Sequence, residues 1–582
     1  MLWHIGNTTV RTPYRLRDAL LRLQGSEFNG NLIGRDQEHA FALHLDQSGV
    51  LSAPRADAGV DASDLGRKWR SALSQLGLIT PALTTRLKSG QQDSHLTRMM
   101  EGLDLPYQSP FEITSSGANL AGSESLAAQQ ECFLRALVAY QIPSILEPRY
   151  RETDAFSPLL HSIEVLRAVE KRYEIPAVTS DEFALFLQTS TPSGGAESIA
   201  EQIGEFRDRC EGGAQQRKAT LSSLKSSVAN ENEVVVRTLY DYADLSARCL
   251  KATGLLLSHK RGGVCLNPSK RLMCDLLLQE PEVRLEDREY LHRLWRGAEL
   301  PTDDVSTSIQ VLSDLRSQLR EQGVEIPDPV TDIDAQGLAT QRHDLEGRLS
   351  RLREEAYASA QAQKFKEIGV WMESIRTGRS VWLDDETTLS VPRGERPAYL
   401  EWILWRAFLA IDSLVNTPWD ARRFEVDQDF LPVHCAPGGG PDMQFEFDEY
   451  VVVVEVTLTS SSRQEAAEGE PVRRHVADVM QKTDKEVFGL FVAVQIDSNT
   501  AHTFRLGDWY LQDDRKMSLQ IVPMMLEDFR DFFLSGESRP DEMVQLLKEM
   551  LLRCRVHANE EAPAWKATIR SIVDRYARHR NA

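Results

Sequence analysis

Two acidic residues in the last third of the chain have the types and spacing for metal-ion chemistry. Residues 451–454 form an uninterrupted valine run, which predicts a strand buried on both faces, and Glu455 follows directly. An ionised carboxylate in such a place costs several kcal/mol unless it is paired or binds a metal ion. Asp442 follows a Gly-Gly-Gly-Pro turn and precedes the strand candidate MQFEF, so a hairpin would bring it close to Glu455. Two converging carboxylates make a hard-oxygen site suited to Mg²⁺.

The same residues also have purely structural interpretations. Asp442 alone is typical of a turn, where aspartate is common after glycine and proline. Its combination with Glu455 at the end of the valine strand favours the metal site. On a strand, Glu455 and Thr457 point to the same side, while Val456 points back into the core.

This stretch resembles a known nuclease core. Pro441-Asp442 followed by Glu455-Val456-Thr457 resembles the PD-(D/E)xK pattern, with Thr457 where most members carry lysine. The continuation, VEVTLT and then SRQEAAEGEPVRRH, resembles the AlwI-type restriction endonucleases, and so does the opening WHIGNTTVRTPYRLRDAL. Enzymes of that family read a short asymmetric DNA site and cut to one side of it, and some relatives nick a single strand.

The resemblance implies a set of site residues. Threonine cannot act as the base that activates water, so Glu468 and His475, which match the AlwI-type pattern, are the candidates; an unperturbed histidine titrates near neutrality. Glu401 would join the metal ligands, although it is also explained as a helix-start glutamate. His475 is likewise explained as a polar residue of an amphipathic helix. The implied catalytic set is Asp442, Glu455, Glu468, His475 and Glu401, with Mg²⁺ bound by Asp442, Glu455 and Glu401.

Basic residues in two regions are candidates for contacts with DNA phosphates. Arg473 and Arg474, together with Arg463 and Gln464, flank the acidic site. Near the N-terminus lies a cluster that an arm or helix could lay along phosphates, and a predicted helix, DLGRKWRSALSQLGLITP, carries more cations in its first turns. A solvated helix face is the alternative for both. These N-terminal residues are Arg11, Arg15, Arg17, Arg67, Lys68 and Arg70.

The N-terminal elements predict DNA-recognition units of the winged-helix type. Asp64 is expected to cap the basic helix, and PFEITSSGANLAG is expected to form a short wing after it. Ser125 is expected to cap a helix that Pro143 stops, and Ser180 with Asp181 to cap another. A hairpin, LLLSHK and VCLN, with a basic tip at Lys260 and Arg261, suggests a further helix and wing.

The C-terminal elements predict an α/β sheet covered by helices. Residues 341–375 are expected to form one long exposed helix, and YLEWILWRAFLAIDSL an apolar one carrying Glu401. Glu468 is expected in a loop, and Pro471 at the start of the next helix. VFGLFVAVQI predicts a second buried strand, and MMLEDFRDFF and MVQLLKEMLLRCRV predict helices that cover the sheet.

Length and pattern together predict a multidomain α+β protein. At 582 residues the chain is expected to hold about three or four domains of roughly 150 residues. N-terminal helical winged-helix recognition subdomains precede a C-terminal α/β PD-(D/E)xK restriction-endonuclease-like domain. The expected boundaries are 1–123 for the first recognition subdomain, 124–280 for the second and third, 281–340 for a charged, proline-punctuated linker, and 341–582 for the nuclease domain.

Composition limits the possible classes of protein. The formal net charge of -20 argues against non-specific binding to polyanions, although local basic patches decide DNA binding. The seven cysteines are scattered and lack CxxC spacing, so neither a disulfide framework nor a zinc site is indicated. No apolar run is long enough to span a bilayer, and the N-terminus has no apolar signal core; we expect a cytoplasmic protein.

These observations predict an Mg²⁺-dependent type IIS restriction endonuclease. Its expected partners are double-stranded DNA and a companion DNA methyltransferase, with a monomer recognising the site and a transient dimer cutting both strands. One alternative is a strand-specific nicking enzyme of the same family. The other is a catalytically inactive DNA-binding regulator, against which the intact set of acidic residues argues.

Overall fold

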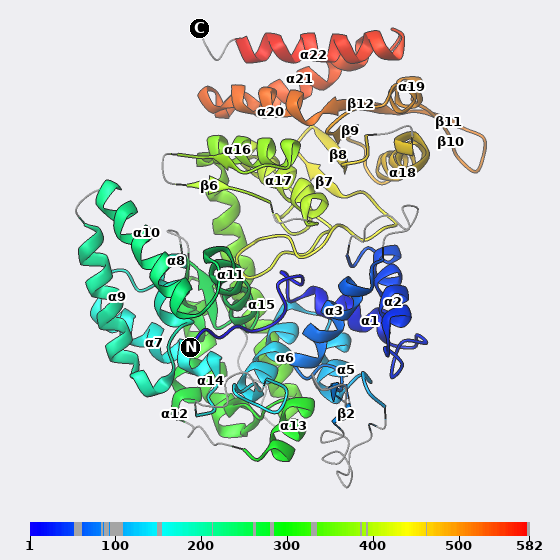
Figure 1. Ribbon diagram of the computed structural model, residues 1–582. Helices are drawn as coiled ribbons and strands as arrows, with labels where there is room; N and C mark the ends of the chain where they lie inside the picture. Colours follow the sequence, from blue (N-terminus) through cyan, green and yellow to red (C-terminus); the bar gives the residue numbers. More distant parts are fainter. Residues whose placement is uncertain are drawn as a thin grey trace. The chain divides into compact units, whose positions relative to one another are not determined.

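The computed structural model (Figure 1) describes residues 1–51, 61–82, 85–86, 92–93, 107, 109–147, 154–211, 214–259, 263–279, 285–326, 334–384, 387–391, 394–460 and 463–578. The chain divides into unit 1, Met1–Leu349, and unit 2, Ser350–Ala582. The division falls within the helix α15 (Ala335–Ser359). Helices and sheets are both present, as predicted. Within the described residues, none of the helices combines the length and apolar character that crossing a membrane requires.

The described part of unit 1 is mostly helical, and its strands form two small antiparallel pairs. Its α-helices are α1 (Arg15–Leu23), α2 (Arg35–Gln47), α3 (Ser63–Gln75), α5 (Ser115–Gly122), α6 (Leu126–Ala139), α7 (Pro158–Arg172), α8 (Ser180–Glu182), α9 (Ala196–Cys210), α10 (Ala214–Glu231), α11 (Val236–Lys251), α12 (Arg271–Gln279), α13 (Asp287–Arg296), α14 (Val305–Glu321) and α15. The short helices are η3 (Phe183–Leu187), η4 (Pro192–Gly194), η5 (Pro268–Lys270) and η6 (Pro301–Asp303). The paired strands are β1 (Thr85–Arg86) with β2 (Gln92–Asp93), and β3 (Leu256–Ser258) with β4 (Val264–Leu266).

The wing predicted over PFEITSSGANLAG is wrong, because most of this segment forms the helix α5. The Thr114 side chain accepts a hydrogen bond from the Gly117 amide and donates one to the Gly77 carbonyl oxygen, which fixes a helix start where a short wing was expected. Asp64 is not a cap either. It lies in the first turn of α3, where its carboxylate pairs with Arg67 and Lys68.

Other local predictions in unit 1 are confirmed or shifted by a residue. The Ser125 side chain caps α6, and the β3–β4 hairpin forms; its expected tip, Lys260 and Arg261, lies outside the described residues. Thr179, rather than Ser180 or Asp181, caps α8, because Glu182 completes a capping box with it. Within the expected linker, α13 and α14 are regular helices with buried leucines, so much of that segment is folded.

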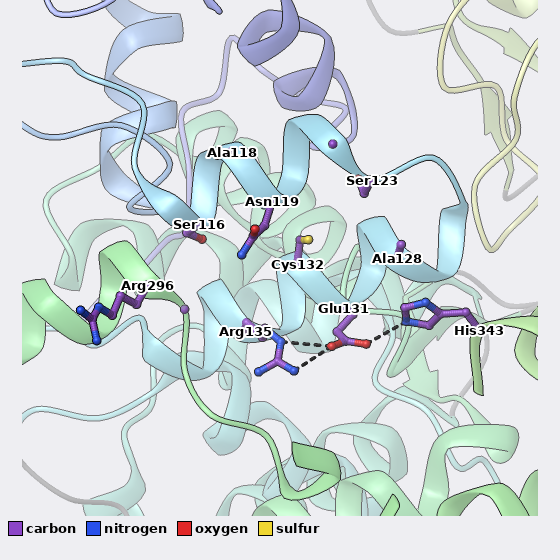
Figure 2. A pocket seen from close by; sticks show the side chains of 12 residues that line it. Ser116, Ala118, Asn119, Ser123, Ala128, Glu131, Cys132, Arg135, Arg296 and His343 are labelled. Carbon is purple, nitrogen blue, oxygen red and sulfur yellow. Dashed lines mark hydrogen bonds and ion pairs between the residues drawn. The ribbon is translucent and has the colours of Figure 1, made fainter. Parts of the chain in front are cut away.

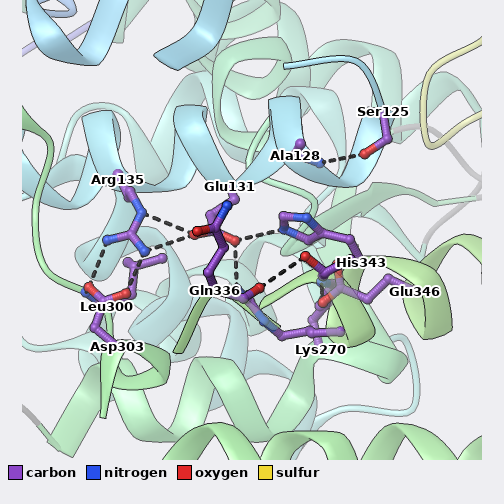
Figure 3. Close-up of polar contacts among 12 residues, drawn as sticks. Ser125, Ala128, Glu131, Arg135, Lys270, Leu300, Asp303, Gln336, His343 and Glu346 are labelled. Carbon is purple, nitrogen blue, oxygen red and sulfur yellow. Dashed lines mark hydrogen bonds and ion pairs between the residues drawn. The ribbon is translucent and has the colours of Figure 1, made fainter. Parts of the chain in front are cut away.

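An ion-pair network in unit 1 joins α6 to α15 (Figures 2 and 3). The Glu131 carboxylate accepts hydrogen bonds from Arg135, Arg342 and His343 at 2.8, 2.6 and 2.8 Å. It borders an open pocket of about 370 Å³. Burial opposes ionisation of Glu131, but the hydrogen bond with His343 and the charge of Arg342 outweigh it and hold the pKa of Glu131 well below its ordinary value.

Replacing Glu131 with glutamine is expected to destabilise unit 1 by about 3–5 kcal/mol, since it leaves the buried guanidinium of Arg342 without its counter-charge. Hydrogen exchange should quicken in the α6 and α15 peptides. The exposed Glu124→Gln is the matched control, with an expected change within about 0.5 kcal/mol. Equal protection in both variants would show that the network contributes no net stability.

A four-stranded sheet, with strand order β12-β9-β8-β7, forms the centre of unit 2. β7 (Met443–Glu446) and β8 (Tyr450–Thr457) form an antiparallel hairpin, while β9 (Glu486–Ala493) is parallel to β8, and β12 (Gln520–Met525) is parallel to β9. Parallel neighbours need a crossover connection, which α18 (Arg463–Met480) supplies between β8 and β9. The valine run and VFGLFVAVQI therefore form buried strands, as predicted.

Helices cover both faces of this sheet. Val452 and Val454 pack into a core with five helices, which are α16 (Phe365–Thr377), α17 (Arg396–Ile411), α20 (Leu526–Ser535), α21 (Met543–Val556) and α22 (Ala562–Arg578). Val451 and Val453 pack on the opposite face against α18 and α19 (Ser498–Leu506). The predicted covering helices are thus confirmed, although MM of MMLEDFRDFF ends β12. The remaining elements in the described part of unit 2 are η7 (Ala360–Gln363), β5 (Val381–Trp382), β6 (Thr388–Leu389), β10 (Asp508–Tyr510), β11 (Lys516–Ser518), η8 (Gly536–Ser538) and η9 (Pro540–Glu542).

Two predicted helix boundaries in this region are wrong. The expected single exposed helix over 341–375 is broken by η7 into α15 and α16, and Ile368 and Met372 of α16 are buried. Helix α18 begins at Arg463, so Pro471 lies inside it and Glu468 is helical rather than in a loop. The Gln-Glu-Ala-Ala-Glu stretch has high helix propensity, and this outweighs the breaking effect of Gly469 and Pro471.

Candidate active site

The β7–β8 hairpin brings two of the predicted acidic residues together. Met443 is paired with Val454, so Asp442 lies opposite Glu455. The Val456 amide donates a hydrogen bond of 2.9 Å to Asp442 Oδ2, and the carboxyl groups of Asp442 and Glu455 hydrogen-bond to each other. Val456 packs toward the core that holds Val452 and Val454. Glu455 and Thr457 therefore face α18.

Helix α18 carries Glu468 and His475 to the same face of the sheet. The two residues are seven positions apart, which places them on one side of a helix. His475 Nδ1 lies 2.5 Å from Glu455 Oε1, and the Thr457 hydroxyl donates to the carboxylate of Glu468. His475 Nε2 is buried, without a hydrogen-bond partner among the described residues. This nitrogen is available to bind a water molecule or a substrate group.

Glu401 approaches from the opposite side, on the buried helix α17. The Ala436 amide donates a hydrogen bond of 2.7 Å to Glu401 Oε2. Burial raises the pKa of Glu401 well above its ordinary value, and the charge of Asp442 raises it further. The structure thus gathers all the predicted acidic residues and His475 at one end of the sheet, while their catalytic roles stay a prediction.

The acidic residues resist ionisation together. Burial raises the pKa of Glu455 most, and together with the charge of Glu468 it brings this pKa to about 8. Burial and the charge of Glu455 raise the pKa of Asp442. Their mutual hydrogen bond raises the pKa of Asp442 and lowers that of Glu455, and such a bond requires a proton on at least one of the two carboxyl groups. Burial and the charge of Arg474 lower the pKa of His475, which favours the neutral imidazole.

Replacing Glu455 with glutamine is expected to stabilise the metal-free protein at pH 8 by about 1–3 kcal/mol. The pKa of Glu455 is raised from 4.5 to about 8 on folding. Between pH 4.5 and about pH 8 the unfolded chain loses the Glu455 proton while the folded chain keeps it. The free energy of unfolding therefore falls as pH rises through this range. Urea unfolding in EDTA at pH 5 and pH 8 measures the difference.

In E455Q this fall in stability should be smaller than in the wild type. Asp448→Asn, at an exposed position in the β7–β8 turn, is the matched control and should keep the wild-type pH dependence. If E455Q and the wild type lose the same stability between the two pH values, Glu455 is not the group that resists ionisation.

A further cation, Arg423, lies beside the acidic cluster and was not predicted. Its backbone amide donates to the Asp442 carbonyl oxygen at 3.2 Å, and its charge acts on Glu455 and His475. Nothing in the sequence between α17 and β7 reveals this approach, because the connection from 412 to 442 holds no regular element that fixes a register. The adjacent pair Arg422-Arg423 is the one signal that draws attention to it.

The predicted DNA-binding residues near the site have contacts within unit 2. Arg473 donates to the Gly469 carbonyl oxygen and stacks on Trp509, while Arg474 pairs with Glu470. The amide of Gln464 donates to the carbonyl oxygens of Thr459 and Gln495, and thereby ties the start of α18 to the sheet. Gln464 therefore has a structural function here.

The predicted DNA-binding residues of unit 1 are also largely engaged with carboxylates. Arg11 pairs with Asp241 and Asp244, and Arg70 pairs with Glu38 while its guanidinium lies over Phe111. Arg67 and Lys68 share Asp64, a contact on the surface that an approaching phosphate can replace at small cost. Arg15 and Arg17 are half-buried on α1. Their roles in DNA binding stay predictions.

The donor set fits a hard divalent cation. No group of three or more His, Cys, Asp or Glu side chains in the described ranges is arranged as a ready-made metal site. Mg²⁺, however, is commonly held by one or two carboxylates with water and substrate phosphate completing its shell. Asp442 and Glu455 supply two such carboxylates, and the proton of their mutual hydrogen bond marks a place where a cation would replace it.

One family model and two solved structures are similar to this chain. The model of the AlwI restriction endonuclease family matches residues 74–532. The small subunit, R.BspD6I2, of the heterodimeric restriction endonuclease R.BspD6I is 20% identical, with a TM-score of 0.28 over 36% of this chain and 97% of that one. Restriction endonuclease FokI is 12% identical, with a TM-score of 0.22 over 90% of this chain and 94% of its own.

No curated protein matches the chain significantly. The assignment rests on the family model, which spans most of the sequence and includes every residue of the acidic cluster. The chain belongs to the AlwI restriction endonuclease family and is a site-specific deoxyribonuclease.

Proposed function

We propose that the protein is an Mg²⁺-dependent type IIS restriction endonuclease, which reads a short asymmetric site in double-stranded DNA and hydrolyses phosphodiester bonds to one side of it. The observation that carries the proposal is the convergence of Asp442, Glu455, Glu468 and His475 at one end of the sheet. A family of restriction endonucleases supplies the substrate class, which is DNA.

Hydrolysis of a phosphodiester needs an attacking water and neutralisation of the scissile phosphate. Asp442 and Glu455 would hold Mg²⁺, with Glu401 assisting, and the bound ion would neutralise phosphate charge and make a coordinated water more acidic. His475 would take a proton from the attacking water at Nε2, the nitrogen that lacks a partner within the described residues. Thr457, by donating to Glu468, would orient that carboxylate toward the same water.

The two units suggest a division of labour. Residues 1–123 and 124–280 would recognise DNA, with Arg11, Arg15, Arg17, Arg67, Lys68 and Arg70 on the phosphates, and 341–582 would cut, with Arg473 and Arg474 beside the scissile strand. A monomer would bind the asymmetric site. A companion methyltransferase would protect the host copies of that site.

A nicking enzyme is the second candidate. The described part of unit 2 holds a single acidic cluster of this kind, whereas two strands of opposite polarity must be cut. One chain acting alone would therefore open one strand. Double-strand cleavage by this protein would require a second copy, joined in a transient dimer.

Digestion of a supercoiled plasmid of known sequence tests the proposal. With Mg²⁺ we expect cuts at a fixed distance from one short asymmetric sequence, mapped by sequencing both fragment ends. If linear DNA forms at a rate that rises with protein concentration, the transient dimer is supported. Accumulation of open-circular DNA supports nicking. If the purified protein cuts no DNA at any Mg²⁺ concentration, the enzymatic proposal is wrong.

A further inference from the structure

We infer that Arg423 is a catalytic residue of this site, whose guanidinium binds a non-bridging oxygen of the scissile phosphate. The inference rests on the proposed function, and it concerns how the acidic cluster accepts an anionic substrate. Four acidic residues converge there, so a phosphodiester must approach against their negative charge unless a cation offsets it.

The backbone fixes the position of Arg423. Residues 421–423 extend along β7: the Gln444 amide donates to the Ala421 carbonyl oxygen at 3.0 Å, and the Arg423 amide donates to the Asp442 carbonyl oxygen at 3.2 Å. Arg423 is thereby held beside Asp442 by two hydrogen bonds across the same edge. These backbone hydrogen bonds fix where the Arg423 side chain begins, on the strand edge that carries Asp442.

The hydrogen-bond donors of the Arg423 side chain are poorly satisfied within the protein. Its Nη2 donates to the Gly438 carbonyl oxygen at 3.4 Å, which is a long contact, and Nη1 is buried with no hydrogen-bond partner among the described residues. An unpaired buried donor on a charged group is unfavourable, by roughly 1–3 kcal/mol or more. An anionic ligand would relieve this cost.

The adjacent arginine shows what a structural role looks like in this fold. Arg422 donates to Glu354 through Nε and Nη2, and to the Phe424 carbonyl oxygen through Nη1. Its side chain is also stacked on Trp405. Arg422 is therefore fully engaged, whereas Arg423 keeps a donor for a group that the protein does not provide.

The glycine turn leaves room for the guanidinium. A Cβ atom placed on Gly440 would lie 2.5 Å from Arg423 Nη1 and 3.0 Å from its Cζ. Gly440 has no positive φ, so alanine is compatible with its backbone. The substitution G440A would therefore displace the end of the Arg423 side chain while the charge stays on the chain.

Guanidinium groups suit this task because their planar fork matches the oxygens of a phosphate. In hydrolysis a water oxygen bonds to phosphorus, one P–O ester bond breaks, the water gives a proton to the base, and the leaving oxygen gains one from solvent. Negative charge grows on the non-bridging oxygens, and a donor aimed at them contributes most at that point.

The test compares R423Q, R423K and G440A with the control R553Q, which removes an exposed arginine of α21. Single-turnover cleavage should slow by about a hundredfold or more in R423Q. It should also slow, but by a smaller factor, in R423K and G440A. R553Q should cleave like the wild type. Hydrogen exchange of the β7 and β8 peptides checks that each variant is folded.

A binding measurement gives a second readout that needs no cleavage. In EDTA, the wild type should bind a duplex with one uncharged methylphosphonate at the mapped cut position several times more weakly than the native duplex. In R423Q the difference should disappear, because both changes remove the same contact. The inference is overturned if R423Q cleaves within about threefold of the wild-type rate. It is also overturned if the methylphosphonate weakens binding by the same factor in R423Q and in the wild type. Absence of cleavage by the wild type instead overturns the proposed function.

Discussion

Replacing Asp442 with asparagine is expected to reduce single-turnover cleavage by about a thousandfold or more, while binding to the recognition site stays within about twofold. The carboxyl group lies opposite Glu455 and hydrogen-bonds to it, so it is one of the two groups that would hold the cation. The change removes an ionisable oxygen and keeps the size of the side chain. Gel shift in EDTA and quenched-flow cleavage in Mg²⁺ measure the two quantities.

Asp448→Asn is the matched control, because Asp448 lies in the same hairpin but is exposed in the β7–β8 turn. It should bind and cleave like the wild type. Cleavage by D442N at a rate near that of the wild type would remove Asp442 from the metal site, and equal loss in D448N would show that the hairpin, rather than the carboxylate, is being disturbed.

Replacing His475 with alanine is expected to slow cleavage by about 10²- to 10⁴-fold at pH 7.5 and to change the pH profile. The pKa of His475 is lowered by burial and by the charge of Arg474, so the ring is neutral at this pH and ready to accept a proton. As pH falls through that lowered pKa the base is lost, so wild-type cleavage should decline on acidification. In H475A at saturating Mg²⁺ this acid limb should be absent, because the carboxylates then bind the cation rather than protons.

The comparison is made at several Mg²⁺ concentrations, since protonation of the carboxylates also weakens metal binding in acid. His502→Gln, at an exposed position of α19, is the control and should keep both the rate and the profile. If H475A loses activity but keeps the wild-type acid limb, His475 positions Glu455 through the contact at Nδ1 and does not activate water.

The central strand and its acidic end were predictable because local pattern decides them. A valine run followed by a carboxylate specifies a buried strand with a polar end, and alternation places Glu455 and Thr457 on one face. Asp442 follows from the hairpin, since a short turn leaves little choice of register. The approach of His475 and Glu468 came from the family resemblance, because sequence pattern alone does not say which face of the sheet a helix covers.

The predictions that failed depended on competition between signals. Gly469 and Pro471 suggested a loop, yet the residues before them favour a helix, and packing of Val472 and Val476 against the sheet holds α18 continuous. The segment before Ser115 contains β-branched residues, but the Thr114 cap started a helix. Arg423 was missed because its contacts join positions 423 and 442 across an irregular connection, which no periodicity records.

Calorimetric titration of the protein with Mg²⁺ at pH 7, in two buffers of different ionisation enthalpy, tests the central claim most directly. We expect binding that releases protons, because the cation replaces the proton of the hydrogen bond between Asp442 and Glu455, and we expect both the binding and the release to be lost in D442N and E455Q. Binding that involves no proton release and is unchanged in those two variants would contradict the account.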